Sequence, residues 1–429
     1  MVWTLLLGGM AVTAFTGVPI GIGLALIGLG ILQFAAGGAS DLAVTAVWNL
    51  FTEFTLSAVP LFIFMGDIML VSGVSSRLYT ALAPFFAKIP GKLLHTNIAV
   101  STLFGAVSGA STSTAAAVGS VAYPELKRRG YDRPTVVGTL AAGGTLGLLI
   151  PPSLSLLLYG ATQQVSIGKL FLAGIIPGIM LAVFMMVLIY VITKRNPHLV
   201  PEETTTVKWG EAFVNLLKIW PLGFLIFAVL GTIYLGLATP TEAAGLGVAA
   251  SIILGFLWGD LTLDKLWRTF LHSVQVFVAI GVIILGALIL AQAISILGLP
   301  HEVMGWIKSL QLGPNAVLLA VTIFYLILGC FFDGISLMLM TLPIVFPVMT
   351  AAGFDPVWLG VIITILIEVG MLTPPVGMNL FVITGITNNE VTLVEAARAA
   401  LPYWLLLLFG ILVLTVFPQI ALVLPNMMF

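Results

Sequence analysis

Long apolar runs separated by short polar segments occupy most of the 429 residues. A helix needs about 20 apolar residues to cross the hydrocarbon core of a bilayer, so each run of that length is a candidate membrane span. Hydrophobic residues make up 60% of the chain and charged residues only 8%, which is typical of an integral membrane protein. The predicted spans lie near 3–34, 54–75, 134–160, 170–193, 218–238, 240–258, 268–298, 357–385 and 401–425.

Lys and Arg residues gather in a few loops, and such loops face the cytoplasm. They are Arg77, Lys88 and Lys92, the stretch KRRGYDR at 127–133, Lys194 with Arg195, and Lys265 with Arg268. The segment 94–126 lies between two of these basic loops, so we expect that it does not cross. It is best explained as a re-entrant hairpin with its tip near Ser108 to Ser113. Non-helical backbone at the depth of the membrane must be buried in protein or line a water-filled cavity. The N-terminus is then cytoplasmic and the C-terminus periplasmic.

An internal repeat emerges when the chain is compared with itself at an offset of 223 residues. The matched positions are Pro124 and Pro347, Gly130 and Gly353, Asp132 and Asp355, Gly147 and Gly370, and the pairs Pro151–Pro152 and Pro374–Pro375. The basic stretch 127–133 corresponds to TAAGFDP at 350–356, which contains no basic residue. This difference predicts an inverted-topology repeat whose second hairpin, near 315–350, enters from the periplasm. The alternative is two parallel repeats, which would place the loop 350–356, without Lys or Arg, in the cytoplasm.

Each predicted hairpin is followed by a span that contains a proline pair. Tandem prolines open a helix, and the freed carbonyls can coordinate a cation while half-helix N-termini can hold an anion. Lys, Arg and His are nearly absent from the span centres, so an anion would be held by hydroxyl and backbone N–H groups. The alternatives are a simple kink, close helix packing, or hydroxyls bonded to the preceding turn. The candidate binding residues are Ser108, Ser111, Thr112, Ser113, Ser153 and Ser155, and in the second copy Gly334, Ser336, Thr373 and Asn379. Thr114, farther from the tip, is expected to tolerate replacement.

Three acidic residues in or next to apolar segments need separate explanations. Asp333 lies where the second hairpin should turn, and we expect a ligand or cation contact there, with capping of the turn as the alternative. Glu368 precedes the second proline pair, and helix pairing and an ion site both remain open for it. Glu242 has a structural explanation, because Thr239 and Pro240 form a capping box with it.

The residue inventory disfavours several other functions. The four histidines, His95, His198, His272 and His301, do not have ligand spacing for a metal. There is no phosphate-binding loop of the ATPase type, so we expect that ATP does not drive the protein. We also expect no nucleic-acid partner. The stretch AVSGAS weakly resembles an intramembrane serine hydrolase motif, but no histidine base accompanies it. A channel is the other alternative, and paired broken helices favour a carrier over it.

Five stretches together resemble the large membrane subunit (M, DctM-like) of tripartite ATP-independent periplasmic (TRAP) transporters. They are GAVSGASTSTAAAVGSVAYPELKRRGYDRP, LAAGGTLGLLIPPSLSLLLYG, LATPTEAAGLG, CFFDGIS and MLTPPVGMNLFVITG. The resemblance implies an all-α polytopic, elevator-type fold of the ion-transporter superfamily. It implies sodium-coupled import of an organic acid across the bacterial inner membrane, with Na⁺ as the coupling ion. It also implies a small four-span membrane subunit and a periplasmic substrate-binding protein as partners.

The resemblance extends to individual residues and to a division of the chain. Its sodium positions are matched by Ser108, Ser111, Gly147, Gly370 and Thr373, and its substrate positions by Ser153, Ser155 and Asp333. The implied parts are scaffold helices 1–93, a first transport unit 94–168, scaffold and linker 169–314, a second transport unit 315–390, and a last scaffold helix 391–429. A sialic acid, a C4-dicarboxylate and a 2-oxo acid all remain open as substrates, with a slight preference for a sialic acid. A stand-alone sodium-driven anion carrier of the same superfamily is the alternative.

Overall fold

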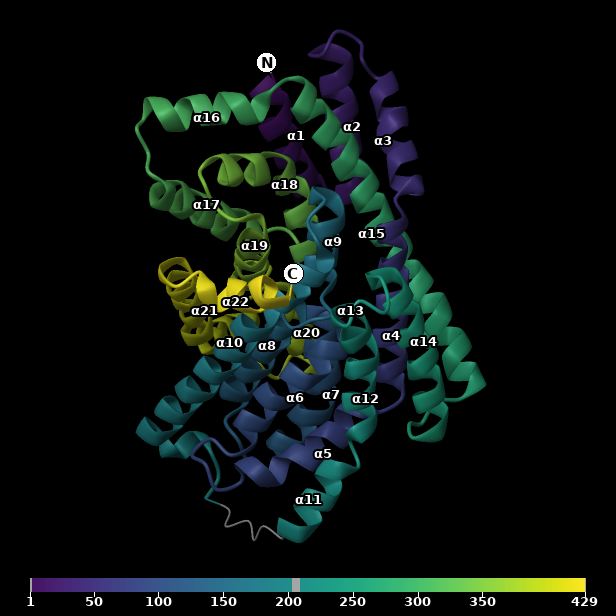
Figure 1. Cartoon of the computed structure of the whole chain (residues 1–429). Coiled ribbons are helices and arrows are strands. Elements are labelled where there is room, and N and C mark those ends of the chain that lie inside the picture. Colours follow the sequence, from purple (N-terminus) through teal and green to yellow (C-terminus); the bar gives the residue numbers. More distant parts are fainter. Residues whose placement is uncertain (1, 203–208, 429) are drawn as a thin grey trace.

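The computed structural model describes residues 2–202 and 209–428, and these residues form helices and no strands (Figure 1). Eight described helical segments are long and apolar enough to cross a membrane. The first part of the chain forms α1 (Val2–Thr16), α2 (Ile20–Phe34), α3 (Asp41–Thr52), a 3-10 turn (Phe54–Ser57), α4 (Ala58–Val71), α5 (Val74–Phe86), α6 (Leu93–Ser108), α7 (Ser111–Arg128), α8 (Arg133–Leu149), α9 (Leu154–Gln163), α10 (Ile167–Arg195) and a 3-10 turn (Pro197–Leu199). It continues with α11 (Trp209–Leu217), α12 (Trp220–Ile226), a π-helical turn (Phe227–Gly231) and α13 (Thr232–Tyr234). The rest forms α14 (Pro240–Leu257), α15 (Leu263–Ile296), α16 (Leu299–Ser309), α17 (Pro314–Gly329), α18 (Gly334–Ala351), α19 (Pro356–Met371), α20 (Met378–Ile386), α21 (Leu393–Val416) and α22 (Gln419–Met428).

The repeat seen in the sequence is present in the helices. The first residues of α7 and α18, Ser111 and Gly334, are 223 positions apart, as are Arg133 and Pro356, which begin α8 and α19. Each antiparallel helix pair, α6–α7 and α17–α18, is followed by a helix that breaks at its proline pair and resumes as α9 or α20. In Figure 1, α6 to α8 lie in the lower half of the molecule and α17 to α19 in the upper half. That each pair enters and leaves the membrane on one side stays a prediction.

The first predicted span is wrong, and the last has different bounds. Residues 3–34 form two short antiparallel helices, α1 and α2, because Gly17 adopts a left-handed conformation (φ +70°) and ends the first of them. Their contact is close: a Cβ atom on Gly9 would lie 2.6 Å from Ile27 Cγ1. In place of the predicted span 401–425, α21 (Leu393–Val416) is long and apolar enough to cross a membrane; it ends before Pro418, and α22 follows. The segments 35–53 and 299–314, which lie outside the predicted spans, contain α3 and α16.

Two buried helices, α8 and α19, form the centre of the fold. Every residue of 136–149 and of 358–371 is buried. The repeats use the same glycine contact to bring a hairpin helix against this centre. A Cβ atom on Gly105 would lie 2.8 Å from the Cα of Gly147, and one on Gly329 would lie 2.7 Å from the Cα of Gly370. Helices α6 and α17 therefore approach α8 and α19 at near backbone contact.

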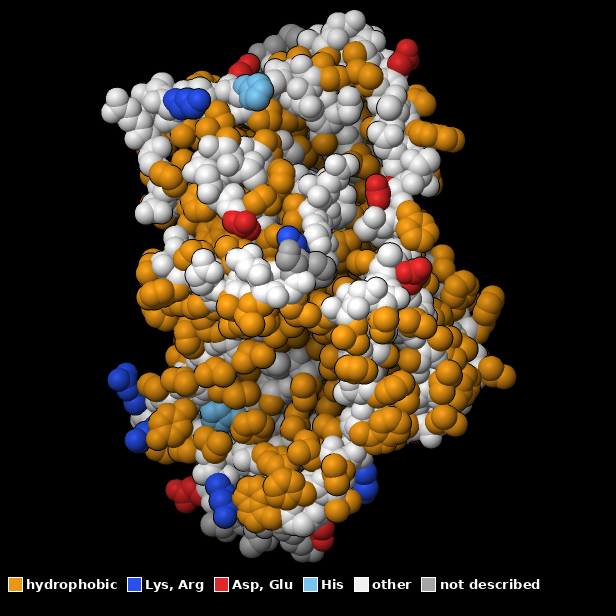
Figure 2. Space-filling model, viewed as in Figure 1, with side chains coloured by type: hydrophobic (Ala, Val, Ile, Leu, Met, Phe, Trp, Pro, Cys, Tyr) orange, Lys and Arg blue, Asp and Glu red, His pale blue; other side chains and the backbone are white. Residues whose placement is uncertain are grey.

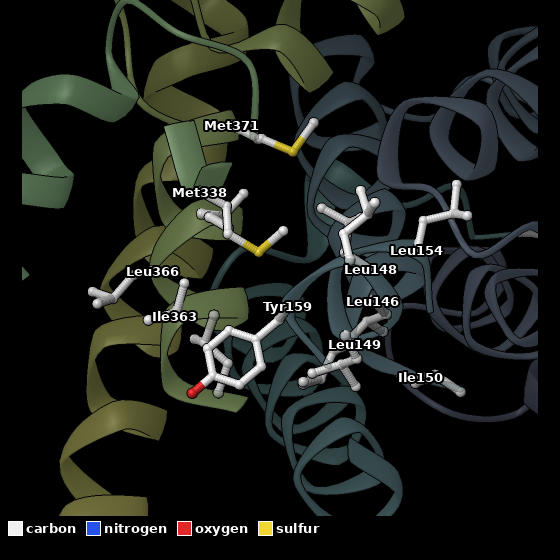
Figure 3. Packing of buried hydrophobic residues seen from close by; sticks show 14 of the residues in the cluster. Leu146, Leu148, Leu149, Ile150, Leu154, Tyr159, Met338, Ile363, Leu366 and Met371 are labelled. Atoms are coloured by element: carbon white, nitrogen blue, oxygen red, sulfur yellow. The ribbon is translucent and has the colours of Figure 1, made fainter. Parts of the chain in front are cut away.

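The two repeats meet through side chains of α9, α18 and α19 (Figure 3). The Tyr159 hydroxyl donates to the Pro356 carbonyl at 2.7 Å, and Tyr159 is fully buried. Outside this core, α15 packs along α2 and also contacts α3 and α4, while α14 packs on α4. Figure 2 shows hydrophobic side chains over the middle of the visible face and several Lys and Arg side chains at its lower end. This distribution is typical of a protein embedded in a membrane.

Candidate functional site

The tip of the first helix pair brings three oxygen atoms together. The hydroxyls of Ser108 and Thr114 are 2.5 Å apart, and they donate to the carbonyl of Ala110 at 3.3 Å and 2.8 Å. Both side chains are buried. The expectation that Thr114 lies outside the tip is therefore wrong, because the first turn of α7 returns its hydroxyl to the link between the two helices.

Gly147 of α8 forms the wall next to these oxygen atoms. A Cβ atom at this position would lie 2.8 Å from the Ala110 carbonyl oxygen and would overlap the Thr114 hydroxyl. The structure thus brings Ser108 and Gly147, two of the predicted sodium residues, to one place. The third predicted residue there, Ser111, begins α7 and points elsewhere, as described below.

Each tip is tied to its helix break by one backbone hydrogen bond. The Leu154 N–H, just after the first proline pair, donates to the Gly109 carbonyl at 3.1 Å. The Val376 N–H, just after the second proline pair, donates to the Cys330 carbonyl at 3.2 Å. In both breaks the Pro–Pro peptide bond is cis. The tip and the break of each repeat are therefore one connected unit.

The two predicted serines of the first break are buried and bonded within the protein. Ser153 caps α9, accepting the Leu156 N–H at 3.2 Å and donating to the Leu148 carbonyl. The Ser155 hydroxyl lies 3.0 Å from the Thr364 hydroxyl of α19, so it links the two repeats. These contacts are structural, and substrate binding by the two serines stays a prediction.

The second tip is built differently, with a carboxylate at the start of its second helix. Asp333 accepts the Ser336 N–H at 3.1 Å and so caps α18, which is the alternative considered for it. The Ser336 hydroxyl oxygen is buried and has no hydrogen-bond partner among the described residues. Gly334 packs against α19, and Thr373 donates back to the Val369 carbonyl at 2.6 Å. A ligand role for Asp333 stays a prediction.

Asn379 connects the second break to the first tip. Its side-chain amide donates to the Ser111 hydroxyl at 2.7 Å and to the Ala141 carbonyl at 3.1 Å. Its Oδ1 atom is buried and has no partner among the residues that the structure describes. Thr112 and Ser113, also predicted as binding residues, are half-buried on α7. Two predicted residues 268 positions apart are thus in direct contact, which the sequence did not indicate.

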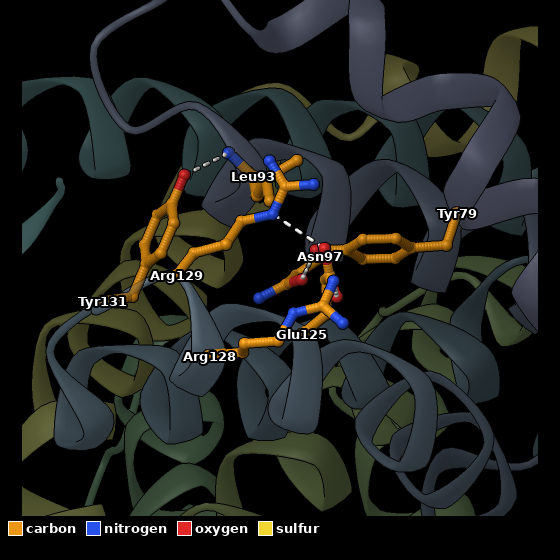
Figure 4. Close-up of polar contacts among 7 residues, drawn as sticks. All are labelled: Tyr79, Leu93, Asn97, Glu125, Arg128, Arg129 and Tyr131. Atoms are coloured by element: carbon orange, nitrogen blue, oxygen red, sulfur yellow. Dashed lines mark hydrogen bonds and ion pairs between the residues drawn. The ribbon is translucent and has the colours of Figure 1, made fainter. Parts of the chain in front are cut away.

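A polar network at the lower end of the first helix pair was not predicted (Figure 4). The Tyr79 hydroxyl donates to Asn97 at 3.3 Å, and the Asn97 amide donates to the Thr139 hydroxyl at 2.9 Å. Near it, Arg129 donates to Glu125 at 2.7 Å, and this bond holds the pKa of the Glu125 carboxyl below its usual range. A cavity of about 660 Å³ lies beside this network, lined by residues of α5, α7 and α11. None of the predicted binding residues lines it.

The structural explanation of Glu242 is confirmed. The Thr239 hydroxyl accepts the Glu242 N–H at 3.3 Å, and the Glu242 carboxylate accepts the Thr239 N–H at 2.8 Å. Together these bonds form the capping box that begins α14.

Comparison with known proteins places this geometry among transporters. The family model described as "Tripartite ATP-independent periplasmic transporter, DctM component" matches residues 7–420. The chain is 35% identical to the C4-dicarboxylate TRAP transporter large permease protein of Pseudomonas aeruginosa, over 93% of this chain and 92% of that one. It is 35% identical to the ectoine/5-hydroxyectoine large permease of Ruegeria pomeroyi, over 87% of each chain. It is 30% identical to the sialic acid large permease of Vibrio cholerae, over 96% of each chain.

The fold also resembles a solved transporter of low sequence similarity. The YdaH transporter of Alcanivorax borkumensis superposes with a TM-score of 0.63, covering 92% of this chain and 89% of that chain at 16% identity. This likeness concerns the fold alone. The relatives are transporter permease subunits, so the chain is a membrane transport protein and not an enzyme.

Proposed function

Because the chain belongs to the DctM component family of TRAP transporters, we propose that it imports an organic acid by sodium-coupled secondary transport. The observation that carries the proposal is the pair of symmetry-related units, each with a hairpin tip bonded to a proline-broken helix. Such paired breaks near the membrane centre are the usual binding elements of secondary transporters. Import across the bacterial inner membrane, with a cytoplasmic N-terminus, belongs to the same proposal.

The first sodium ion would bind at the tip of α6–α7. Na⁺ is a hard cation that prefers oxygen ligands, and the hydroxyls of Ser108 and Thr114 and the Ala110 carbonyl supply three of them. Absence of a side chain on Gly147 leaves these oxygens room to turn toward an ion. Ser111 would contribute after releasing Asn379. The donor chemistry therefore fits the proposed ion.

The second sodium ion would bind at the matching break, near Gly370 and Thr373. The Thr373 hydroxyl is the available side-chain oxygen there, and it donates to the Val369 carbonyl in this conformation. A neighbouring glycine pair, Gly329 and Gly370, keeps the backbone of α17 and α19 close to each other. The proposal includes both sites, because each repeat provides a tip that is bonded to its break, while the side chains of the two tips differ.

The organic acid would be held between the two units by hydroxyl, amide and backbone groups. The Ser336 hydroxyl and the Asn379 side chain are buried, and each has an oxygen without a partner among the described residues. The site would also include Asp333 at the start of α18, and Ser153 and Ser155 at the start of α9. The positive N-terminal end of the half-helix α9 would favour the carboxylate. Relatives are named for a C4-dicarboxylate and for a sialic acid, which supports these two as candidates, and a 2-oxo acid stays a candidate from the sequence resemblance.

Movement would follow the elevator scheme, with units 94–168 and 315–390 sliding against a scaffold. The contacts of α15 with α2, α3 and α4 support such a scaffold, since they join helices outside both units. A small four-span subunit would reinforce it, and a periplasmic binding protein would deliver the substrate. Both partners are part of the proposal.

Reconstitution in liposomes tests the proposal. The chain is inserted with and without the small subunit, the binding protein is added outside, and uptake of labelled carboxylates is measured with an inward sodium gradient. We expect uptake only with sodium and with both partners. Equal uptake after replacement of sodium by potassium would refute sodium coupling. Full uptake of free substrate by this chain alone would instead indicate the stand-alone carrier.

A further inference from the structure

A crevice of about 390 Å³ lies between α21 and the second helix break, and it is called the α21 crevice below. Leu372, Thr373 and Pro374 line it on the side of the break, and five residues of α21 line it on the other side. Most of these side chains are apolar. Among the described residues that line the crevice, Arg398 is the charged one.

The α21 crevice opens on a face of the protein that suits contact with lipid. Helix α21 is long and apolar enough to cross a membrane. Val394 and Leu401, which line the crevice, are more than half exposed, and so is Leu405 one turn farther along the same face. In a membrane, hydrocarbon rather than water would therefore meet this part of α21.

The charged end of the crevice lies beside the basic loop 127–133. Arg398 is in the second turn of α21. Glu390, just before this helix, forms ion pairs with Lys127 and, at 3.5 Å, with Arg133. Loops rich in Lys and Arg lie at the membrane surface, so the Arg398 side chain lies near the depth of the lipid headgroups.

Two polar groups of the α21 crevice lack a partner. The guanidinium of Arg398 forms no hydrogen bond or ion pair with the described residues. The acid on the same helix, Glu395, is already engaged, because its carboxylate accepts the N–H and the hydroxyl of Thr392 at 2.8 Å each. Trp404 Nε1 is buried and has no acceptor among the described residues. It lies six residues beyond Arg398, or about 9 Å along the helix axis.

We propose that the α21 crevice binds an anionic phospholipid from the leaflet next to the loop 127–133. The phosphate would pair with Arg398, since a guanidinium matches the geometry of phosphate oxygens. An acyl chain would lie along Leu372, Pro374 and Leu401, and an ester carbonyl would accept the Trp404 N–H. Basic pockets between membrane helices are typical sites for anionic headgroups. Lipid binding does not depend on the proposed function, although under that function the lipid would touch both the second transport unit and the last scaffold helix.

Native mass spectrometry of the full chain in a neutral detergent tests the site without any transport. Phosphatidylglycerol and phosphatidylcholine with the same acyl chains are added at equal concentration. We expect one phosphatidylglycerol molecule to bind about fivefold more tightly, because one basic side chain near the surface attracts an anionic lipid with about 1 kcal/mol. Arg398→Gln should bind the two lipids equally, whereas Arg398→Lys should keep most of the preference. Arg195→Gln is the matched control with the same loss of charge, because Arg195 is exposed at the end of α10 and does not line the crevice.

A second variant tests the apolar part of the site. Leu401→Trp fills the crevice from an exposed position, so it should fold and should weaken the binding of both lipids at least fivefold. Excess inorganic phosphate should not displace the lipid, because the acyl chain contributes to binding. The proposal would be overturned by an unchanged lipid preference in Arg398→Gln, by unchanged binding in a monodisperse Leu401→Trp, or by displacement with phosphate. Loss of the bound lipid on addition of the small subunit would also overturn it, since the crevice would then be a contact between proteins.

Discussion

Replacing Gly147 with Ala perturbs the first proposed sodium site without removing any of its oxygen atoms. The new methyl group would lie 2.8 Å from the Ala110 carbonyl oxygen and would overlap the Thr114 hydroxyl. The carbonyl belongs to the backbone of the tip and cannot rotate away alone. The tip must therefore shift, while the chemical identity of its oxygen ligands is unchanged.

The expected cost follows from packing. Adding a methyl group to a filled core costs about 1–3 kcal/mol. If the strain falls on the ion-bound tip, the apparent sodium affinity drops by the corresponding factor, roughly 5-fold to 150-fold at about 1.4 kcal/mol per tenfold. Gly30→Ala is the matched control, because a Cβ on Gly30 of α2 meets no atom within 4 Å. Alanine also favours a helix over glycine there.

The assay is the sodium dependence of uptake in proteoliposomes that contain both partners. Gly147→Ala should need more sodium for half-maximal uptake and should recover part of its rate at saturating sodium. Gly30→Ala should behave as the wild type. If Gly147→Ala is monodisperse and has the wild-type sodium dependence, the oxygens next to Gly147 do not hold sodium.

Three further predictions concern the same molecule. Ser108→Ala, Ser111→Ala and Thr114→Ala should each reduce uptake at limiting sodium while the protein stays monodisperse; normal uptake by all three would make the tip a packing element. With a tenfold sodium gradient and 100 mV, two sodium ions per monoanion supply roughly 5 kcal/mol, or about 5,000-fold accumulation, and measured accumulation near tenfold would indicate one ion. Arg129 lowers the pKa of Glu125 in the folded state, so the bond between them stabilises the fold at pH values above the usual Glu pKa. This stabilisation is lost as pH falls and the carboxyl takes up a proton. Melting of Glu125→Gln should therefore vary less than the wild type between neutral and acidic pH; identical profiles would exclude this contribution.

Much of the architecture could be predicted because proline, glycine and aspartate act locally. Asp132 and Asp355 cap α8 and α19 in the structure, and each is followed by a proline in the first turn. The proline pairs interrupt both helices where the sequence places them. Such residues shape the backbone wherever they occur, so their repetition at one offset revealed the repeat.

Features that depend on distant contacts were missed. The hydrophobic pattern of 3–34 is continuous, and the left-handed Gly17 with Pro19 before α2 divides it into a helix pair, a local signal that was overlooked. The contact of Asn379 with Ser111 joins different repeats, so no local pattern encodes it. The sequence pattern also did not predict α16, because its apolar residues are interspersed with polar ones such as His301 and Lys308.

The hydrogen bonds from each break to its tip suggest how ion binding and substrate binding are coupled. An ion that draws the Ala110 carbonyl toward it moves the link next to Gly109, which accepts the Leu154 N–H at the start of α9. The same movement reaches Ser111 and, through it, Asn379 of the second break. Under the proposed function, ion occupancy at one tip would therefore change the position of groups on both sides of the proposed substrate site. Coupling by this route needs only local shifts of a connected unit, because the tips and breaks are already bonded to one another.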